Sequence, residues 1–195
     1  MRHFALALVA ILSLAACEVV TVSTPPTGTP RPATFGPPPG ANGSLTPITI
    51  DTTLLGILPR EVSSVPVIES PEGESDAMAD TVLPTIATAA VAAVAVDTST
   101  SDLVYVLVVR LRPDVFSADT FRDWRDSYDE GACLGVSNVV GHAELNIGKH
   151  HVYIGTCANG LRTYHTWIED RAILIAASST GDRTFGVILL GTLRE

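Results

Sequence analysis

Four histidines lie close together in the second half of the chain, and their side chains could perform acid–base or metal chemistry. All four fall within 24 residues: His142, His150, His151 and His165. Neutral imidazole is a common zinc ligand, and a histidine that contacts a hydroxyl group can act as a general base. One hypothesis is therefore a hydrolase or a metal-dependent protein that uses this group.

Strand geometry argues against a metal site at these histidines. His150 and His151 are consecutive, so on a strand their side chains point to opposite faces. If the Asn-Gly pair that follows forms a two-residue turn, His165 pairs with Ile154, and His150 lies on the same face about 13 Å away at ~3.3 Å per residue. Zinc ligands must all lie about 2 Å from one ion. We expect solvated histidines at strand ends, although His142 could still approach His150 or His151 from a loop.

The beginning of the chain has the features of an export signal that ends in a cysteine. Arg2 and His3 give it a weakly positive start, and residues 4–14 are apolar except for Ser13. Such a stretch is too short to cross a bilayer, which takes roughly 20 residues, but it fits the apolar core of a secretory signal. The residues at 14–17 read Leu-Ala-Ala-Cys.

This ending resembles the lipobox of bacterial lipoproteins, in which small residues precede a lipidated cysteine. The resemblance implies that residues 1–16 are removed as a signal peptide and that Cys17 carries diacylglycerol and palmitate. Each buried CH₂ group contributes about 0.8 kcal/mol, so two or three acyl chains anchor a protein stably. The implied location is the cell membrane, on its extracytoplasmic side.

A tether is predicted at 17–47, rich in Pro, Gly and Thr. Eight of the 13 prolines and four glycines lie between Thr21 and Pro47. Proline lacks the N–H group that helices and sheets need, so this stretch is expected to be disordered and extended. It would hold a folded domain at 48–195 away from the lipid headgroups.

Two cysteines remain for that domain, Cys133 and Cys157. In an exported protein such a pair is expected to form a disulfide, which here closes a loop of about 25 residues and contributes roughly 3–4 kcal/mol in the chain-entropy model. A redox or metal-binding thiol pair is the alternative, but redox catalysts usually use Cys-x-x-Cys, which the sequence lacks.

Composition limits the partners of the chain. Its net charge is −9, and only one of its 12 basic residues is lysine. Nucleic-acid binding needs clustered cations, so we expect no nucleic-acid partner. The mean hydropathy of +0.32 excludes a wholly disordered chain.

Hydrophobic patterning predicts an α+β domain, in which helices pack on an antiparallel sheet. Strands are expected at 90–96 and 103–112, and Asn159-Gly160 predicts a hairpin of two further strands. Ser75 is the expected N-cap of a helix that begins at Asp76 and is interrupted at Pro84.

A second helix is expected from the N-cap Ser117 to about Glu130. Its aromatic residues fall at helical spacing and predict a face directed at the core: Phe121, Trp124 and Tyr128. Opposite charges four residues apart predict ion pairs on the outer face, between Arg122 and Asp126 and between Arg125 and Asp129. The order of elements is similar to the PsbP-like fold of some actinobacterial lipoproteins, a likeness of pattern rather than of motif.

An acidic stretch contains Glu69, Glu72, Glu74 and Asp76. Calcium is bound by six to eight oxygens, but the EF-hand pattern is not matched, so a solvated loop is expected.

The chain has no His-Glu-x-x-His, Gly-x-Ser-x-Gly, Gly-x-x-x-x-Gly-Lys or Gly-x-Gly-x-x-Gly motif. We therefore expect no cofactor and favour a membrane-anchored lipoprotein that is a non-enzymatic binding or envelope accessory module, with an envelope protein, a glycan or a lipid as possible ligand. The alternative is an extracytoplasmic hydrolase or metal-dependent protein that uses the four histidines.

Overall fold

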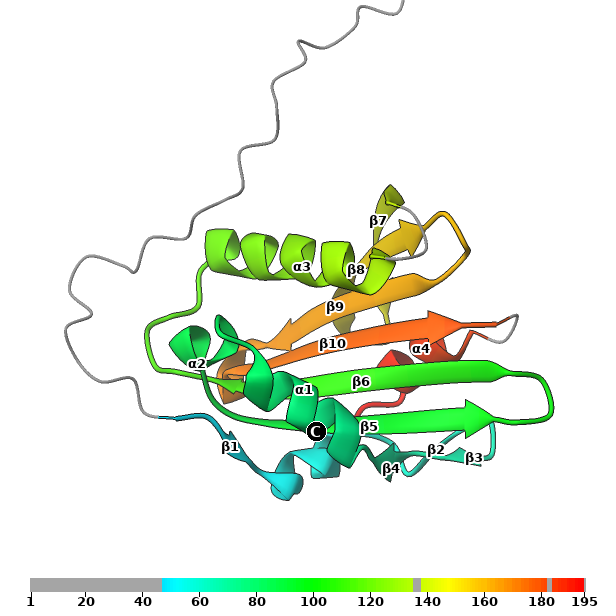
Figure 1. The fold of residues 1–195 in the computed structure, drawn as a ribbon, viewed down its shortest axis with the longest axis horizontal. Coiled ribbons are helices and arrows are strands. Elements are labelled where there is room, and N and C mark those ends of the chain that lie inside the picture. The colour runs from blue at the N-terminus through cyan, green and yellow to red at the C-terminus, as the bar shows by residue number, and fades with distance from the viewer. Residues whose placement is uncertain (1–46, 135–137, 182–183, 195) are drawn as a thin grey trace, which may run out of the picture. The chain divides into compact units, whose positions relative to one another are not determined.

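An eight-stranded, mostly antiparallel sheet with helices on both faces forms the described part of the chain (Figure 1). The computed structural model describes residues 47–134, 138–181 and 184–194. The predicted signal peptide, the lipidation site Cys17 and all of the tether except Pro47 lie outside these residues. The expected α+β class, an antiparallel sheet with helices packed on it, is confirmed.

The strands of the sheet follow one another in the order β1-β5-β6-β10-β9-β8-β7, and β4 pairs with β5. Every pairing is antiparallel except that of β1 with β5. Their bounds are Thr49–Ile50 (β1), Ile68–Glu69 (β4), Ala87–Asp97 (β5), Asp102–Leu111 (β6), Val139–Ile147 (β7), His150–Cys157 (β8), Arg162–Ile168 (β9) and Ile173–Thr180 (β10). A separate two-stranded ribbon joins β2 (Glu61–Val62) and β3 (Val65–Pro66).

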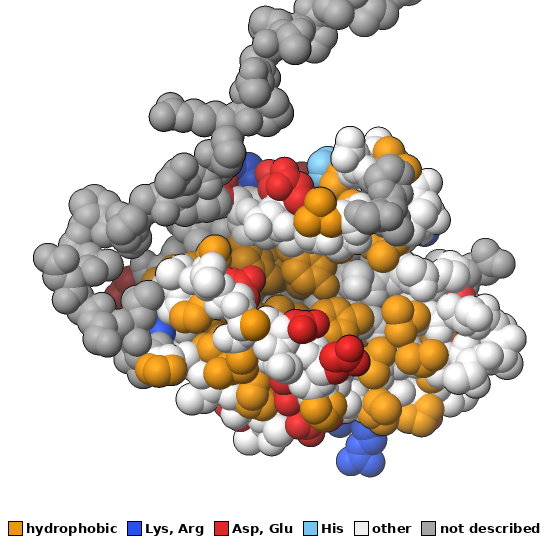
Figure 2. Space-filling view, viewed as in Figure 1, with side chains coloured by type: hydrophobic (Ala, Val, Ile, Leu, Met, Phe, Trp, Pro, Cys, Tyr) orange, Lys and Arg blue, Asp and Glu red, His pale blue; other side chains and the backbone are white. Residues whose placement is uncertain are grey.

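Three α-helices cover one face of the sheet, and a fourth packs on the other face with a 3₁₀ helix. The first group is α1 (Pro71–Ala79), α2 (Leu83–Ile86) and α3 (Ala118–Cys133); the second is η1 (Thr52–Ile57) and α4 (Phe185–Gly191). A short 3₁₀ turn, η2 (Glu169–Arg171), joins β9 to β10. Figure 2 shows the face with α1 and α3, where acidic side chains lie over both helices and hydrophobic side chains lie between them. None of the helices in the described ranges has the length and apolar character needed to cross a membrane.

Two hydrophobic cores result, one on each face of the sheet. Alternate residues of a strand point to opposite faces, so β5 contributes Val91 and Ala93 to one core and Ala90 and Ala92 to the other. Because both faces are covered, β5 and β6 are apolar on both sides rather than alternating. The expected strands at 90–96 and 103–112 are thereby confirmed.

Small residues in β5 allow α1 to lie close to the sheet. A Cβ atom added at Gly73 would lie 2.5 Å from the ring of Tyr105 and 3.0 Å from the Cβ of Ala92. The small side chain of Ala92 therefore allows α1 to lie directly against the sheet.

The expected start of α1 was wrong by five residues. The N-cap is Ser70, whose hydroxyl accepts a hydrogen bond from Gly73 N–H, and Pro71 occupies the first turn. Proline is favoured there because the missing N–H would have no helical partner, and this Ser-Pro signal outweighs Ser75. The helix also ends at Ala79, before Pro84.

The start of α3 agrees with the sequence. Ser117 is its N-cap, and the Ser117 hydroxyl accepts a hydrogen bond of 3.0 Å from Thr120 N–H. The helix continues to Cys133, one turn beyond the expected end near Glu130, and this extra turn brings Cys133 to the sheet.

Candidate functional site

The turn between β8 and β9 decides which face of the sheet each histidine occupies. It is a three-residue loop, closed by a hydrogen bond from Cys157 N–H to Leu161 O (2.9 Å). Gly160 has φ +87°, a conformation that favours glycine. The expected two-residue turn is therefore wrong, and His165 pairs with Tyr153 instead of Ile154. A shift of one residue moves a side chain to the opposite face, so His165 lies beneath α3.

The other histidines divide between the two faces of the sheet. His142, opposite Gly155, and His151, whose ring centroid lies 4.8 Å from that of Tyr153, are on the α3 face. His150 is on the other face and is buried, so the expectation that it shares a face with His165 is wrong. His142 and His151 are exposed to solvent, as expected, whereas His150 and His165 are buried. Within the described ranges, no three His, Cys, Asp or Glu side chains are grouped to hold a metal ion.

Asp129, on α3, is the centre of a buried hydrogen-bond cluster with His165 and Thr163. Its side chain is 1% exposed, and its Oδ1 accepts hydrogen bonds from His165 Nε2 (2.6 Å) and Thr163 Oγ1 (2.5 Å). The Thr163 hydroxyl in turn accepts a hydrogen bond of 3.1 Å from Gly155 N–H. These bonds tie α3 to both β8 and β9.

The ion pairs expected on the outer face of α3 are wrong. Asp129 points into the sheet, and Arg125 contacts the neighbouring Asp126 instead (2.8 Å) and lies over the Tyr153 ring. Arg122 contacts Asp119 and Asp123 rather than Asp126.

Aromatic rings separate the cluster from solvent. The rings of Trp124 and Tyr128 lie nearly perpendicular to the His165 ring, with centroid distances of 5.5 and 5.2 Å. Phe121 is fully packed against Tyr153. The expected aromatic face of α3 therefore does pack toward the sheet, and it encloses a polar cluster that the sequence analysis did not predict.

The cluster holds one charge at neutral pH. Burial opposes ionisation of Asp129, but the hydrogen bonds from His165 and Thr163, together with the neighbouring His165 and His142 rings, lower the Asp129 pKa below its ordinary value. Burial lowers the pKa of His165, and this effect outweighs the opposing influence of Asp129. Asp129 is thus a carboxylate and His165 a neutral imidazole, with its proton on Nε2 because a carboxylate only accepts hydrogen bonds.

The lowered pKa of His165 predicts that the domain loses stability on mild acidification. Below pH 6.5, the ordinary pKa of histidine, the unfolded chain is protonated at His165 while the folded domain is not. The free energy of unfolding should therefore fall as the pH decreases from 7 to 5. Buried His150, whose pKa burial also lowers, acts in the same direction. Urea unfolding at several pH values measures the slope of the unfolding free energy against pH.

His165→Gln is the variant that isolates this contribution. Its amide can donate to Asp129 but does not titrate, so the slope between pH 7 and 5 should become shallower. An unchanged slope would contradict the assignment.

The predicted disulfide is confirmed, and it forms one wall of a pocket. The sulfur atoms of Cys133 and Cys157 lie 2.01 Å apart and join the end of α3 to the end of β8. The adjacent pocket, which we call the α3–β7 pocket, has a volume of about 540 Å³. Its described lining consists of Asp126, Asp129, Glu130, Cys133, Leu134, Asn138, Val139 and His142.

One polar atom in the α3–β7 pocket lacks a hydrogen bond. Asp129 Oδ2 is buried and has no hydrogen-bond partner among the described residues. The Nε2 atom of His142, whose side chain is 57% exposed, lies 3.5 Å from this oxygen, at the long end of hydrogen-bond distances. One carboxylate oxygen is therefore bonded to β9, and the other is buried between Gly155 and His142, a residue that lines the pocket.

Gly155 makes this arrangement possible. A Cβ atom there would lie 2.5 Å from Asp129 Oδ2 and would also collide with the Thr163 hydroxyl. We expect Gly155→Ala to lower the free energy of unfolding by about 1–3 kcal/mol, because overpacking displaces the cluster. Gly141→Ala on β7 is the matched control, since nothing lies within 4 Å of its added Cβ. Equal urea midpoints for the two variants would contradict the prediction.

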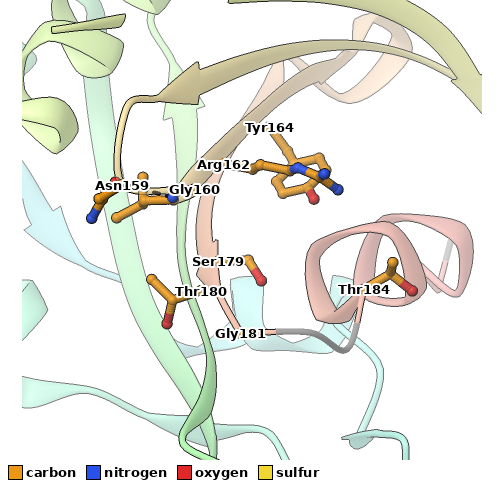
Figure 3. A pocket seen from close by; sticks show the side chains of 9 residues that line it. Asn159, Gly160, Arg162, Tyr164, Ser179, Thr180, Gly181 and Thr184 are labelled. Carbon is orange, nitrogen blue, oxygen red and sulfur yellow. Dashed lines mark hydrogen bonds between the residues drawn. The ribbon is translucent and has the colours of Figure 1, made fainter. Parts of the chain in front are cut away.

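A second cavity, of about 440 Å³, lies between the β8–β9 turn, the end of β10 and the start of α4 (Figure 3). Arg162 is its cation and lies beside Tyr164. Burial raises the pKa of Tyr164 above its ordinary value, and the charge and hydrogen bond of Arg162 oppose this effect. The remaining described lining is mostly small and polar: Asn159, Gly160, Leu161, Ser179, Thr180, Gly181 and Thr184. No buried side-chain atom among these described residues lacks a hydrogen bond, so this cavity is a weaker candidate for a ligand site.

The acidic stretch does not form a solvated loop. Glu72, Glu74 and Asp76 lie on α1, and Glu74 is buried. Burial, together with the charge of Glu69, raises the pKa of Glu74 above its ordinary value.

No protein-family model matches the sequence, and neither a curated protein nor a solved structure shows significant similarity to this chain.

Proposed function

We propose that this protein is a lipoprotein, anchored through Cys17 on the extracytoplasmic side of the cell membrane, whose domain is a binding module. The α3–β7 pocket is the proposed ligand site. Support for the anchor comes from the lipobox-like sequence at 14–17 and from the pairing of the other two cysteines, which suits an oxidising compartment.

The single observation that carries the binding proposal is the position of Asp129 Oδ2. It is a buried carboxylate oxygen without a hydrogen bond, and it belongs to a residue that lines an open pocket. Buried polar atoms in folded proteins are nearly always satisfied by protein, water or ligand, because leaving one unpaired costs about 1–3 kcal/mol or more. A ligand that donates a hydrogen bond would satisfy this oxygen; the other two buried atoms without a partner among the described residues, His165 Nδ1 and Glu74 Oε1, belong to residues that do not line the pocket.

Binding is favoured over hydrolysis because the chemically capable groups of the cluster cannot reach a substrate. His165 and Thr163 are both 0% exposed, and both already bond to Asp129. The described lining of the pocket offers His142 but no hydroxyl group, and Cys133 is held in the disulfide. A nucleophile with an adjacent base, which covalent hydrolysis requires, is absent from this described lining.

The anchor is tested with Cys17→Ser in the full-length chain, expressed in a bacterium that processes lipoproteins. Wild-type protein should incorporate labelled palmitate, and the variant should not. Equal labelling of both, or labelling of neither, would overturn the proposed anchor.

The binding site is tested by ligand-observed NMR on the full-length protein in a non-ionic detergent. The probes are n-butylamine, butyrate, 1-butanol and glucose, and the comparison variant is Leu134→Trp, which fills the pocket from a side chain that is 79% exposed. At least one probe should bind wild type and lose binding in the variant. Failure of all four probes would overturn the binding site.

The hydrolase alternative has its own readout. Hydrolysis of p-nitrophenyl acetate by the wild-type protein that disappears in His142→Ala would support it and would overturn the binding module.

A further inference from the structure

We infer that the α3–β7 pocket binds an organic cation, a protonated amine or a guanidinium group attached to a short apolar segment. This inference rests on the proposed function and specifies the class of ligand. It follows from the charge of the pocket, from the hydrogen bond that Asp129 lacks, and from the apolar side chains beside it.

The charge of the pocket is negative. Three of its eight described lining residues carry carboxyl groups, and none is Lys or Arg. Asp126 is offset by Arg125 at 2.8 Å, which leaves Asp129 and Glu130 to set the local potential. The pocket also adjoins the C-terminal end of α3, a 16-residue helix, where the helix dipole favours cations. An anionic ligand would meet repulsion from each of these groups.

The missing hydrogen bond calls for a donor. A carboxylate oxygen only accepts hydrogen bonds, and Oδ1 of Asp129 is already bonded to His165 and Thr163. His142 Nε2 approaches Oδ2 only to 3.5 Å, so an N–H or O–H donor at ordinary hydrogen-bond distance has to come from a ligand. An ammonium or guanidinium group supplies the donor and the compensating charge together, and such charge-assisted bonds are about twice as strong as neutral ones.

The apolar part of the pocket indicates that the cation belongs to an organic molecule. Leu134 is 79% exposed, and half-buried Val139 lines the same pocket next to the Cys133 disulfide. A bare metal ion would gain nothing from these side chains. It would also lack ligands, since the described residues contain no group of three metal-binding side chains.

The test is a titration of the full-length protein in non-ionic detergent with n-butylamine, 1-butanol and butyrate. The first two probes share length and shape but differ in charge. We expect n-butylamine to bind at least tenfold more tightly than 1-butanol, and butyrate not to bind. Equal affinity of the amine and the alcohol, or tighter binding of butyrate, would overturn the cation inference while leaving the binding site itself in place. If none of the three probes binds the wild-type protein, the proposed function itself is overturned.

Two carboxylate variants locate the cation without disturbing the buried cluster. Glu130→Gln, in the pocket, should weaken n-butylamine binding about threefold. Glu144→Gln is the matched control, because Glu144 is exposed on β7, pairs with His151 and does not line the pocket. If both variants weaken n-butylamine binding equally, binding depends only on the overall charge of the protein, and the inference is overturned.

Discussion

Replacing Asp129 by alanine is expected to lower the free energy of unfolding by about 2–6 kcal/mol, the sum of about 1–3 kcal/mol for each of two buried donors left without an acceptor. The change deletes two hydrogen bonds at once and leaves the buried donors of His165 and Thr163 unsatisfied. It also releases α3 from β9. Urea unfolding followed by far-UV circular dichroism measures the loss, and fluorescence of Trp124, which contacts His165, reports on the cluster itself.

Asp126→Ala is the matched control for this prediction. Asp126 lies three residues earlier on α3, is exposed, and forms an ion pair with Arg125. Exposed substitutions of this kind usually change stability by less than about 0.5 kcal/mol. If Asp129→Ala and Asp126→Ala unfold at the same urea concentration, the buried cluster does not hold α3 on the sheet.

Removing the disulfide is expected to cost about 3–4 kcal/mol. The bond joins residues 24 apart. In the chain-entropy model, breaking it raises the conformational entropy of the unfolded chain, which lowers the free energy of unfolding by that amount. The comparison is between wild type and the double variant Cys133→Ser with Cys157→Ser, by thermal and urea unfolding. Because the bond also fixes the end of α3 at the wall of the α3–β7 pocket, the same variant should bind n-butylamine more weakly.

Reductant provides an independent check on the disulfide. Wild-type protein unfolded and refolded in dithiothreitol should match the double variant, while the variant itself should not respond to dithiothreitol. A double variant as stable as oxidised wild type would contradict the assigned contribution.

Much of the fold followed from local sequence signals. Ser117 supplies an N-cap oxygen, and the spacing of Phe121 and Trp124 identifies the face of α3 that packs on the sheet. The cysteine pair was predictable because the signal-like sequence at 4–17 predicts export to an oxidising compartment. In each case the physical cause lies within a few residues or in composition, which a single sequence contains.

The buried cluster was missed because Asp129 was assigned to the outer face through its spacing from Arg125. The spacing of four residues between Asp129 and Cys133 was the better indication of the face on which Asp129 lies. Residues four apart share a helix face, and Cys133 must face the sheet to reach Cys157. Gly155 gave a second signal, since a glycine inside a strand often marks the close approach of another group.

The strand register could not be derived from the turn sequence alone. Asn159-Gly160 suits both a two-residue and a three-residue loop, and the two differ by one residue in pairing. The choice depends on burial of His165 beneath Trp124 and Tyr128, contacts between segments about 40 residues apart in the chain. That one-residue difference moves His165 from the face of Ile154 to the face of Asp129.

The most direct test of the account is where a small cation binds on the protein. Methyl NMR spectra of the full-length chain, recorded during addition of n-butylamine, would locate it through the leucine and valine side chains. The account predicts shifts concentrated at Leu134 and Val139, beside Asp129, with Leu161 in the second cavity unaffected. Shifts centred on Leu161, or no shifts at Leu134 and Val139, would contradict the assignment of the α3–β7 pocket as the ligand site.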